Sequence, residues 1–218
     1  MIRAIVFDFD GTLADTLPLL FHAFREVFRA HAGRELTDGD VVGMFGPTEE
    51  GMIRNGLAPA LHERAVADLH ALYEREHDRF VALDPAILSL LRRLRSAGCR
   101  LAIFTGKGRR TAGISLRRLA LADYFDAVVT GDDVERPKPD PEGLLRALAA
   151  LGAAPAAAVF AGDSEADVRA AKAAGVRAIA VNWLKTPQTT EYTVAPDAMA
   201  RNAHEFWRVL EQWGGAGR

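Results

Sequence analysis

Apolar and polar positions follow two distinct patterns along the chain. Short apolar runs rich in Val, Ile, Phe and Ala are each followed by turn residues, and they cover residues 2–7, 100–104, 127–130, 156–161 and 176–182. Segments with helical periodicity separate the later runs, at 85–97, 108–119, 141–151 and 164–174. This alternation predicts an α/β fold, in which a parallel sheet is flanked by helices on both faces. An amphipathic segment at 203–213 predicts a last helix that closes the core through Phe206, Trp207 and Leu210.

The interval between the first strand and the helix at 85 breaks this rhythm. Two segments in it have helical periodicity, 17–30 and 60–79, and a Gly-rich turn at 43–51 lies between them. The interval is too long for a strand-to-helix loop, which usually has about 2 to 6 residues. We therefore expect a helical subdomain with its own small core at 15–83, inserted into a discontinuous domain formed by 1–14 and 84–218.

The composition of the chain limits which binding partners and which cellular compartment we expect. The chain has 218 residues, 49% of them hydrophobic, and a formal net charge of -2. This balance gives no reason to expect nucleic acid or an anionic membrane as a partner. No apolar run approaches the roughly 20 residues of a membrane helix, and the single cysteine, Cys99, fits a reducing compartment. We expect a cytoplasmic monomer or homodimer.

The residues whose side chains are suited to catalysis or metal binding lie at or after the ends of the predicted strands. Asp8 and Asp10 follow the first strand one residue apart, so both side chains point the same way and two negative charges are crowded together. Later strand ends and the segments after them add Thr105, Gly106, Lys138, Asp163 and Asp167. Each has a structural explanation by itself, such as a turn or a helix cap. Their convergence at the carboxyl edge of one sheet favours a ligand site that holds a cation.

Four motifs resemble those of the haloacid dehalogenase superfamily. They are "DFDGTLADT", "FTGK", "RPKPDP" and "GDSEADVRAAKAAG", in the family's order and spacing. The resemblance extends from residue 1 to about 182 and is strongest to the phosphatase branch near phosphoglycolate phosphatase. It implies a Rossmann-like core, with the insertion at 15–83 as a helical cap between the first and second motifs.

The resemblance also implies roles for the acidic residues. Asp8 matches the nucleophile that accepts the phosphoryl group, and Asp10 matches the general acid and base. Mg²⁺ is expected as the cofactor, held by the side chains of Asp8 and Asp163 and by the backbone carbonyl of Asp10. Asp167 matches a residue that supports the metal ligands.

Other matched positions are expected to bind the transferring phosphate. Thr105 and Lys138 match groups that hydrogen-bond its oxygens, and the backbone at Gly11 and Gly106 is expected to contribute further contacts. Many relatives have Asn where this chain has Gly106, so a side-chain contact from that position is lost. Its backbone amide is still able to donate to phosphate.

Three observations limit the reaction within the family. Asp10 favours phosphate chemistry, because dehalogenating relatives lack the second acid of the motif. Phosphonoacetaldehyde hydrolases use a lysine of the cap, whereas residues 15–83 contain no lysine. In beta-phosphoglucomutases the cap carries an arginine where this chain has Glu49, and a carboxylate there would repel a diphosphorylated ligand. Arg54 and Arg25 are candidates to offset the charge of Glu49.

These inferences lead to one expected activity and several alternatives. We expect a Mg²⁺-dependent phosphate monoester hydrolase that acts on a small phosphorylated metabolite through an aspartyl-phosphate intermediate, with phosphoglycolate as the leading substrate. Glu49 and Arg54 are the candidate specificity residues of the cap. A beta-phosphoglucomutase-like phosphotransferase and a pyrophosphatase are the enzymatic alternatives. A phosphate-binding or regulatory protein that has lost turnover is the non-enzymatic one.

Overall fold

A parallel sheet of six strands forms the centre of the molecule. The computed structural model describes residues 2–189 and 191–214. The strands are β1 (Ala4–Phe7), β2 (Arg100–Phe104), β3 (Ala127–Val129), β4 (Ala158–Gly162), β5 (Arg177–Val181) and β6 (Ala198–Ala200). Their order is β3-β2-β1-β4-β5-β6, and every neighbouring pair is parallel. The predicted α/β, Rossmann-like class is confirmed, and the order reverses between β1 and β4, where such folds bind ligands.

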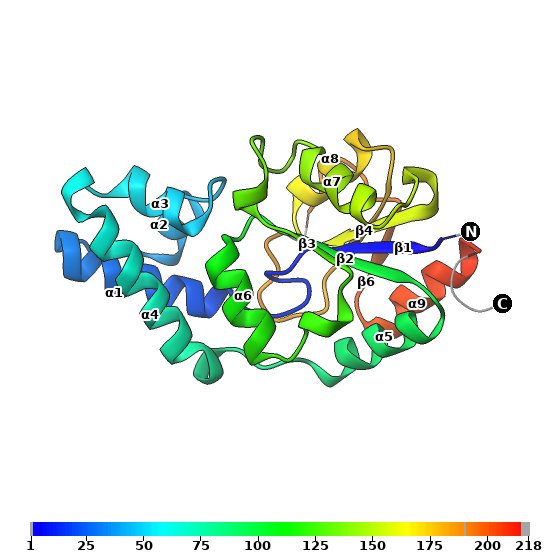
Figure 1. Ribbon diagram of the computed structural model, residues 1–218, viewed down its shortest axis with the longest axis horizontal. Coiled ribbons are helices and arrows are strands. Elements are labelled where there is room, and N and C mark those ends of the chain that lie inside the picture. Colours follow the sequence, from blue (N-terminus) through cyan, green and yellow to red (C-terminus); the bar gives the residue numbers. More distant parts are fainter. Residues whose placement is uncertain (1, 190, 215–218) are drawn as a thin grey trace.

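Helices cover both faces of the sheet (Figure 1). On one face lie α5 (Pro85–Ser96), α6 (Arg109–Arg118) and α9 (Ala203–Gln212), and on the other lie α7 (Glu142–Ala150) and α8 (Glu165–Ala173). The side chains of β1 alternate accordingly, because Ile5 and Phe7 join the first helical layer and Val6 joins the second. Short 3-10 turns occur at Pro59–Leu61, Ala122–Tyr124, Gly131–Asp133 and Pro155–Ala157.

The first four helices form a separate layer beside the sheet, and we call them the cap helices (Figure 1). They are α1 (Leu17–Ala32), α2 (Asp38–Val42), α3 (Glu49–Gly56) and α4 (His62–Phe80). They enclose their own apolar cluster, which includes the fully buried Phe24, Phe28, Ile53 and Leu69. In addition, α4 packs against α6 of the core. The cap helices therefore have an apolar core of their own and also pack against the sheet domain.

Two parts of the sequence-based reading were incomplete. The Gly-rich segment 43–51 is a turn only as far as Thr48, which caps α3 by accepting a hydrogen bond from the amide of Gly51 at 3.4 Å. Both α2 and α3 were missed, since they have only 5 and 8 residues and contain glycine. The sixth strand was missed because its three residues, Ala-Met-Ala, lack the β-branched side chains typical of strands.

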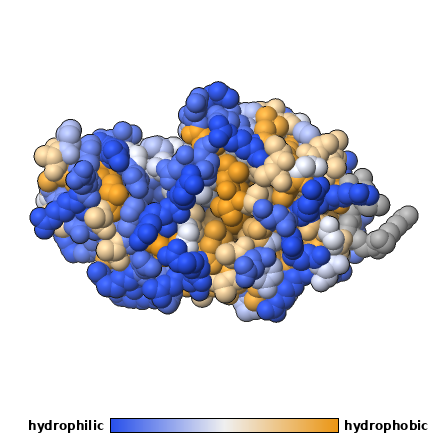
Figure 2. Space-filling model, in the orientation of Figure 1, coloured by the Kyte–Doolittle hydropathy of each residue, from blue (hydrophilic) through white to orange (hydrophobic). Residues whose placement is uncertain are grey.

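The surface in this orientation is mainly hydrophilic over the cap helices, whereas more of the hydrophobic area lies over the core (Figure 2). In the part of the chain that the structure describes, none of the helices combines the length and apolar character that crossing a membrane requires.

Candidate active site

The loop after β1 brings the two predicted catalytic aspartates to the carboxyl edge of the sheet. Asp8 is buried, and its amide donates to the carbonyl of Ala161 on β4 at 2.8 Å. The Asp10 side chain is 15% exposed and accepts a hydrogen bond from the hydroxyl of Thr16. The chain turns directly after Asp10 through Gly11, which has a φ of 77°. The local geometry thus presents both carboxylates to one site.

Asp163 and Asp167 complete a cluster of three buried carboxylates with Asp8. One oxygen from each lies within 4.8 Å of the others. Asp163 directly follows β4, and Asp167 lies in the first turn of α8, where its second oxygen accepts hydrogen bonds from the amide and hydroxyl of Ser164 at 3.0 and 2.5 Å. The structure therefore brings together the side chains that the family resemblance assigns to a metal site.

The pKa values of this cluster indicate that its carboxylates need a positive charge nearby to be ionised. Burial raises the pKa of Asp8 to about 7, with Lys138 opposing the shift and the charges of Asp167 and Asp10 adding to it. Burial also raises the pKa of Asp163 to about 8, reinforced by the charges of Asp8 and Asp167. The ionised forms of both carboxylates are thus disfavoured relative to that of an exposed aspartate unless a positive charge compensates them.

The donor set fits Mg²⁺, which prefers hard oxygen ligands. Oδ1 of Asp8 has no hydrogen bond of standard geometry from the described residues, although it lies 2.9 Å from Nζ of Lys138. The other expected ligand, the carbonyl of Asp10, accepts a hydrogen bond from the side-chain amide of Gln188 at 3.3 Å. Gln188 also donates its backbone amide to Asp163 at 2.7 Å, so it contacts two of the expected ligand residues.

Lys138 lies between two of the carboxylates. Its Nζ is 2.9 Å from Asp8 and 2.7 Å from Asp167, and its side chain is only 10% exposed. Burial alone would lower the pKa of Lys138, but the charges of Asp167 and Asp8 outweigh that effect and raise it. The ammonium is therefore charged and held beside the carboxylate of Asp8.

The two predicted glycines of the site have different roles. Gly106 lines the cavity described below, as Thr105 does. Gly11 was expected to contribute its backbone to phosphate binding, but its amide donates to the carbonyl of Ala14 at 2.9 Å. A Cβ at Gly11 would lie 2.1 Å from Oδ2 of Asp163. The glycine therefore allows the loop to lie close to Asp163.

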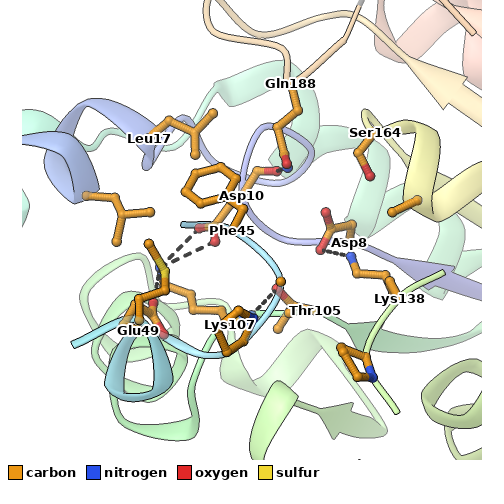
Figure 3. A pocket seen from close by; sticks show the side chains of 17 residues that line it. Asp8, Asp10, Leu17, Phe45, Glu49, Thr105, Lys107, Lys138, Ser164 and Gln188 are labelled. Atoms are coloured by element: carbon orange, nitrogen blue, oxygen red, sulfur yellow. Dashed lines mark hydrogen bonds and ion pairs between the residues drawn. The ribbon is translucent and has the colours of Figure 1, made fainter. Parts of the chain in front are cut away.

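Lys107 is a central residue of the site that the sequence reasoning missed. Its side chain is fully buried, and its Nζ lies 3.2 Å from Asp10 and 3.0 Å from Glu49 of the cap helix α3 (Figure 3). The ammonium is 4.7 Å from the centre of the Tyr73 ring on α4. The available signal was its place in "FTGK", two residues after Thr105, but two of its partners, Glu49 and Tyr73, come from the cap helices.

Glu49 does not present a free negative charge, contrary to the expectation from sequence. One carboxylate oxygen accepts a hydrogen bond from the amide of Gly108 at 2.6 Å, and the other accepts one from the hydroxyl of Thr111 at 2.6 Å. Burial would raise the pKa of Glu49, but the charge of Lys107 and these two hydrogen bonds lower it. Glu49 is thus an ionised residue that joins the cap helices to α6.

The arginines expected to offset Glu49 lie elsewhere. The Arg54 side chain is 60% exposed and pairs with Glu50 at 3.5 Å, so it is not a specificity residue of the cavity in this structure. Arg25 pairs with Asp38 at 2.8 Å. The sequence-based choice was wrong because the compensating cation comes from Lys107 in the core.

A cavity of about 290 Å³ joins these groups (Figure 3). The segments that follow β1, β2 and β3 contribute Asp8, Asp10, Thr105 and Lys138 to its lining. The cap helices and the segment between α2 and α3 contribute Leu17, Leu20, Phe45, Pro47 and Met52. The cavity therefore has a charged floor, formed by the core, and a largely apolar cover, formed by the cap helices.

Comparison with known proteins decides the family. Residues 5–181 match the family described as Haloacid dehalogenase-like hydrolase. The chain belongs to this family. Haloacid dehalogenase-like relatives include Pyrophosphatase PpaX of Bacillus velezensis, which is 33% identical over 208 residues covering 95% of this chain and 96% of the relative.

Solved structures of the same superfamily share the whole fold. CbbY from Rhodobacter sphaeroides in complex with phosphate has a TM-score of 0.82 and 28% identity, covering 94% of this chain and 96% of that one. A putative phosphoglycolate phosphatase from Lactobacillus plantarum has a TM-score of 0.78 and 27% identity, covering 96% and 99%. The predicted membership of the haloacid dehalogenase superfamily is confirmed, and the chain is a phosphatase of this family of hydrolases.

Proposed function

We propose that this phosphatase is a Mg²⁺-dependent phosphate monoester hydrolase that acts through an aspartyl-phosphate on Asp8. The observation that carries the proposal is the buried carboxylate of Asp8, within 4.8 Å of Asp163 and Asp167 and 2.9 Å from Lys138. A nucleophile, a cluster of oxygen ligands and a fixed ammonium meet at one point of the cavity. This combination supports phosphoryl transfer.

In the first half-reaction, an oxygen of Asp8 attacks phosphorus and a new O–P bond forms. The bond between phosphorus and the leaving oxygen breaks, its electron pair stays on that oxygen, and Asp10 supplies the proton. In the second half-reaction, Asp10 takes a proton from water and the resulting hydroxide attacks phosphorus. The bond to Asp8 then breaks, which releases phosphate and restores the carboxylate.

The remaining residues would hold the phosphoryl group in place. Thr105, the amide of Gly106 and Lys138, which all line the cavity, would donate to its oxygens. Asp8 and Asp163 would hold Mg²⁺ with the carbonyl of Asp10, and Asp167 would support them through Lys138 and Ser164. When bound, the ion supplies positive charge that neutralises the carboxylates and the phosphate.

The proposal also covers the setting of the reaction. The substrate would be a small phosphorylated metabolite, since the cavity measures about 290 Å³, and residues 15–83 would act as a cap that shields it from water. We propose a cytoplasmic monomer or homodimer that binds neither nucleic acid nor membranes.

Pyrophosphate hydrolysis is the second candidate function. Curated relatives at about a third identity carry the name pyrophosphatase PpaX, whereas structural neighbours carry names of phosphoglycolate phosphatases and of a putative beta-phosphoglucomutase. A phosphate-release assay with phosphoglycolate, sugar phosphates and pyrophosphate distinguishes these activities. Isomerisation of a sugar phosphate without phosphate release would instead indicate the mutase.

The core proposal is tested with a generic aryl phosphate. Asp8→Asn and Asp10→Asn should each abolish Mg²⁺-dependent hydrolysis while the circular dichroism spectrum stays native. Asp123→Asn is the matched control, since Asp123 is exposed and lies outside the cavity, and it should retain full activity. Undiminished activity of Asp8→Asn would refute the nucleophile assignment, and inactivity of the native protein would favour the non-enzymatic alternative.

A further inference from the structure

Every cation of the cavity is already paired with carboxylates. Within residues 2–189 and 191–214, the lining side chains include two cations, Lys107 and Lys138. Lys138 contacts Asp8 and Asp167, at 2.9 and 2.7 Å. Lys107 contacts Asp10 and Glu49, at 3.2 and 3.0 Å. On the described surface of the cavity, no positive charge is left for a second anionic group of a ligand.

The two lysines serve different ends of the cavity. Lys138 lies beside the nucleophile, so its contacts belong to the transferring phosphoryl group. Lys107 lies beside Asp10, the proposed proton donor to the leaving oxygen, and Glu49 reaches it from the cap side (Figure 3). The charge of Lys107 therefore governs the end of the cavity that receives the leaving group.

The rest of that end is apolar or neutral. Leu17, Leu20, Phe45 and Met52 line the cavity from the cap helices and the segment between α2 and α3, and the side-chain amide of Gln188, which donates to the carbonyl of Asp10, is neutral. A carboxylate or a second phosphate placed among these side chains would lose its hydration without gaining a partner, which is costly. An alcohol with a small carbon skeleton would lose little.

Glu49 prevents Lys107 from serving as that partner. Its carboxylate is fixed by the amide of Gly108 and by the hydroxyl of Thr111, both at 2.6 Å. Removing its charge would leave Lys107 with Asp10 alone and make this end of the cavity more positive. Glu49 therefore controls the charge that a leaving group meets.

We propose that the Glu49–Lys107 pair is the specificity determinant of this phosphatase and selects phosphate esters whose leaving group is uncharged. The inference rests on the proposed hydrolase activity at Asp8, but it assigns a substrate class that the names of the relatives do not give. Pyrophosphate and phosphoglycolate, whose leaving groups are anionic, would then be poor substrates.

The test compares two probes of similar size, 2-hydroxyethyl phosphate and 2-phosphoglycolate, which differ by a hydroxymethyl group against a carboxylate. We expect the native protein to have a kcat/KM at least about tenfold higher for 2-hydroxyethyl phosphate. In Glu49→Gln this preference should fall by about tenfold, mainly through a lower KM for 2-phosphoglycolate. Glu50→Gln is the control, since Glu50 is the next residue of α3 but does not line the cavity, and its preference should be unchanged.

A second variant keeps the test decisive if Glu49→Gln does not fold. Met52→Lys adds a cation to the same end of the cavity and should also raise the relative kcat/KM for 2-phosphoglycolate. If the native protein hydrolyses 2-phosphoglycolate or pyrophosphate as well as 2-hydroxyethyl phosphate, the specificity proposal is wrong and the hydrolase remains. If it hydrolyses neither these probes nor the generic aryl phosphate with Mg²⁺, the proposed function fails as well.

Discussion

Two glycines determine how closely the carboxylates of the site approach one another. A Cβ at Gly11 would lie 2.1 Å from Oδ2 of Asp163, and a Cβ at Gly162 would lie 2.4 Å from Cγ of Asp167. Both distances are far below van der Waals contact. The present positions of the Asp163 and Asp167 side chains therefore depend on the absence of side chains at Gly11 and Gly162.

Replacement of Gly11 by alanine should reduce activity much more than the backbone strain alone would explain. The variant has to accept a φ of 77° and displace Asp163, so we expect a loss of about 1–3 kcal/mol in the free energy of unfolding and at least about a hundredfold loss of kcat/KM. Gly98→Ala is the matched control, because Gly98 has the same φ of 77° and open space around it. Urea unfolding and phosphatase assays of both variants make the comparison, and equal activity would contradict the role assigned to Gly11.

Single residues also show how far the sequence determines the site. Asp8, Asp163 and Lys138 were predictable because each directly follows a strand or lies in a motif next to one, and parallel strands share an edge. Lys107 was not, since its role depends on Glu49 and Tyr73, which reach it only when the cap helices pack against α6. Arg54 was assigned to the cavity wrongly, because the sequence does not show on which side of α3 it lies.

At the scale of elements, the contact between α3 and α6 joins the cap helices to the sheet domain. Glu49 begins α3, and its partners Lys107, Gly108 and Thr111 lie immediately before or within α6. The long amphipathic helices on either side of this contact were predictable from periodicity. The contact was not, because α2 and α3 are short and the segment around them resembles a turn.

Unfolding measurements on this contact should show strong coupling. Lys107→Met and Glu49→Gln should each cost about 3 kcal/mol, because each removes one ionic partner from a buried charge. The double variant should lose about 1–3 kcal/mol less than the sum of the two. The exposed pair Arg54 and Glu50, at 3.5 Å, is the control, and its coupling should stay below about 1 kcal/mol. Additive losses at Lys107 and Glu49 would show that the two side chains do not interact.

At the scale of the whole molecule, the acidic cluster opposes folding stability unless a cation compensates it. The pKa of Asp8 is raised to about 7 and that of Asp163 to about 8, both from 3.8, chiefly by burial. Because these folded-state values exceed the unfolded ones, the associated stability is fully present below the unfolded pKa. It is lost as the pH rises through about 7 and 8.

Magnesium should therefore stabilise the protein in a pH-dependent way. Its binding requires ionised carboxylates and releases their protons, so the increase in Tm on adding MgCl₂ should be larger near pH 8 than near pH 6. Asp163→Asn should remove most of the increase at both pH values. Thermal unfolding with and without the ion measures it, and an increase that is independent of pH would contradict the assignment of these carboxylates.

The central claim is that the phosphoryl group passes through Asp8, and trapping the acyl phosphate tests it most directly. During turnover with Mg²⁺, rapid acid quenching followed by borohydride reduction converts a phosphorylated aspartate to homoserine, which mass spectrometry locates in the peptide. The account predicts homoserine at position 8, none in the protein without substrate, and none in Asp8→Asn. Homoserine at another aspartate, or continued turnover with no trapped residue at any quench time, would contradict it.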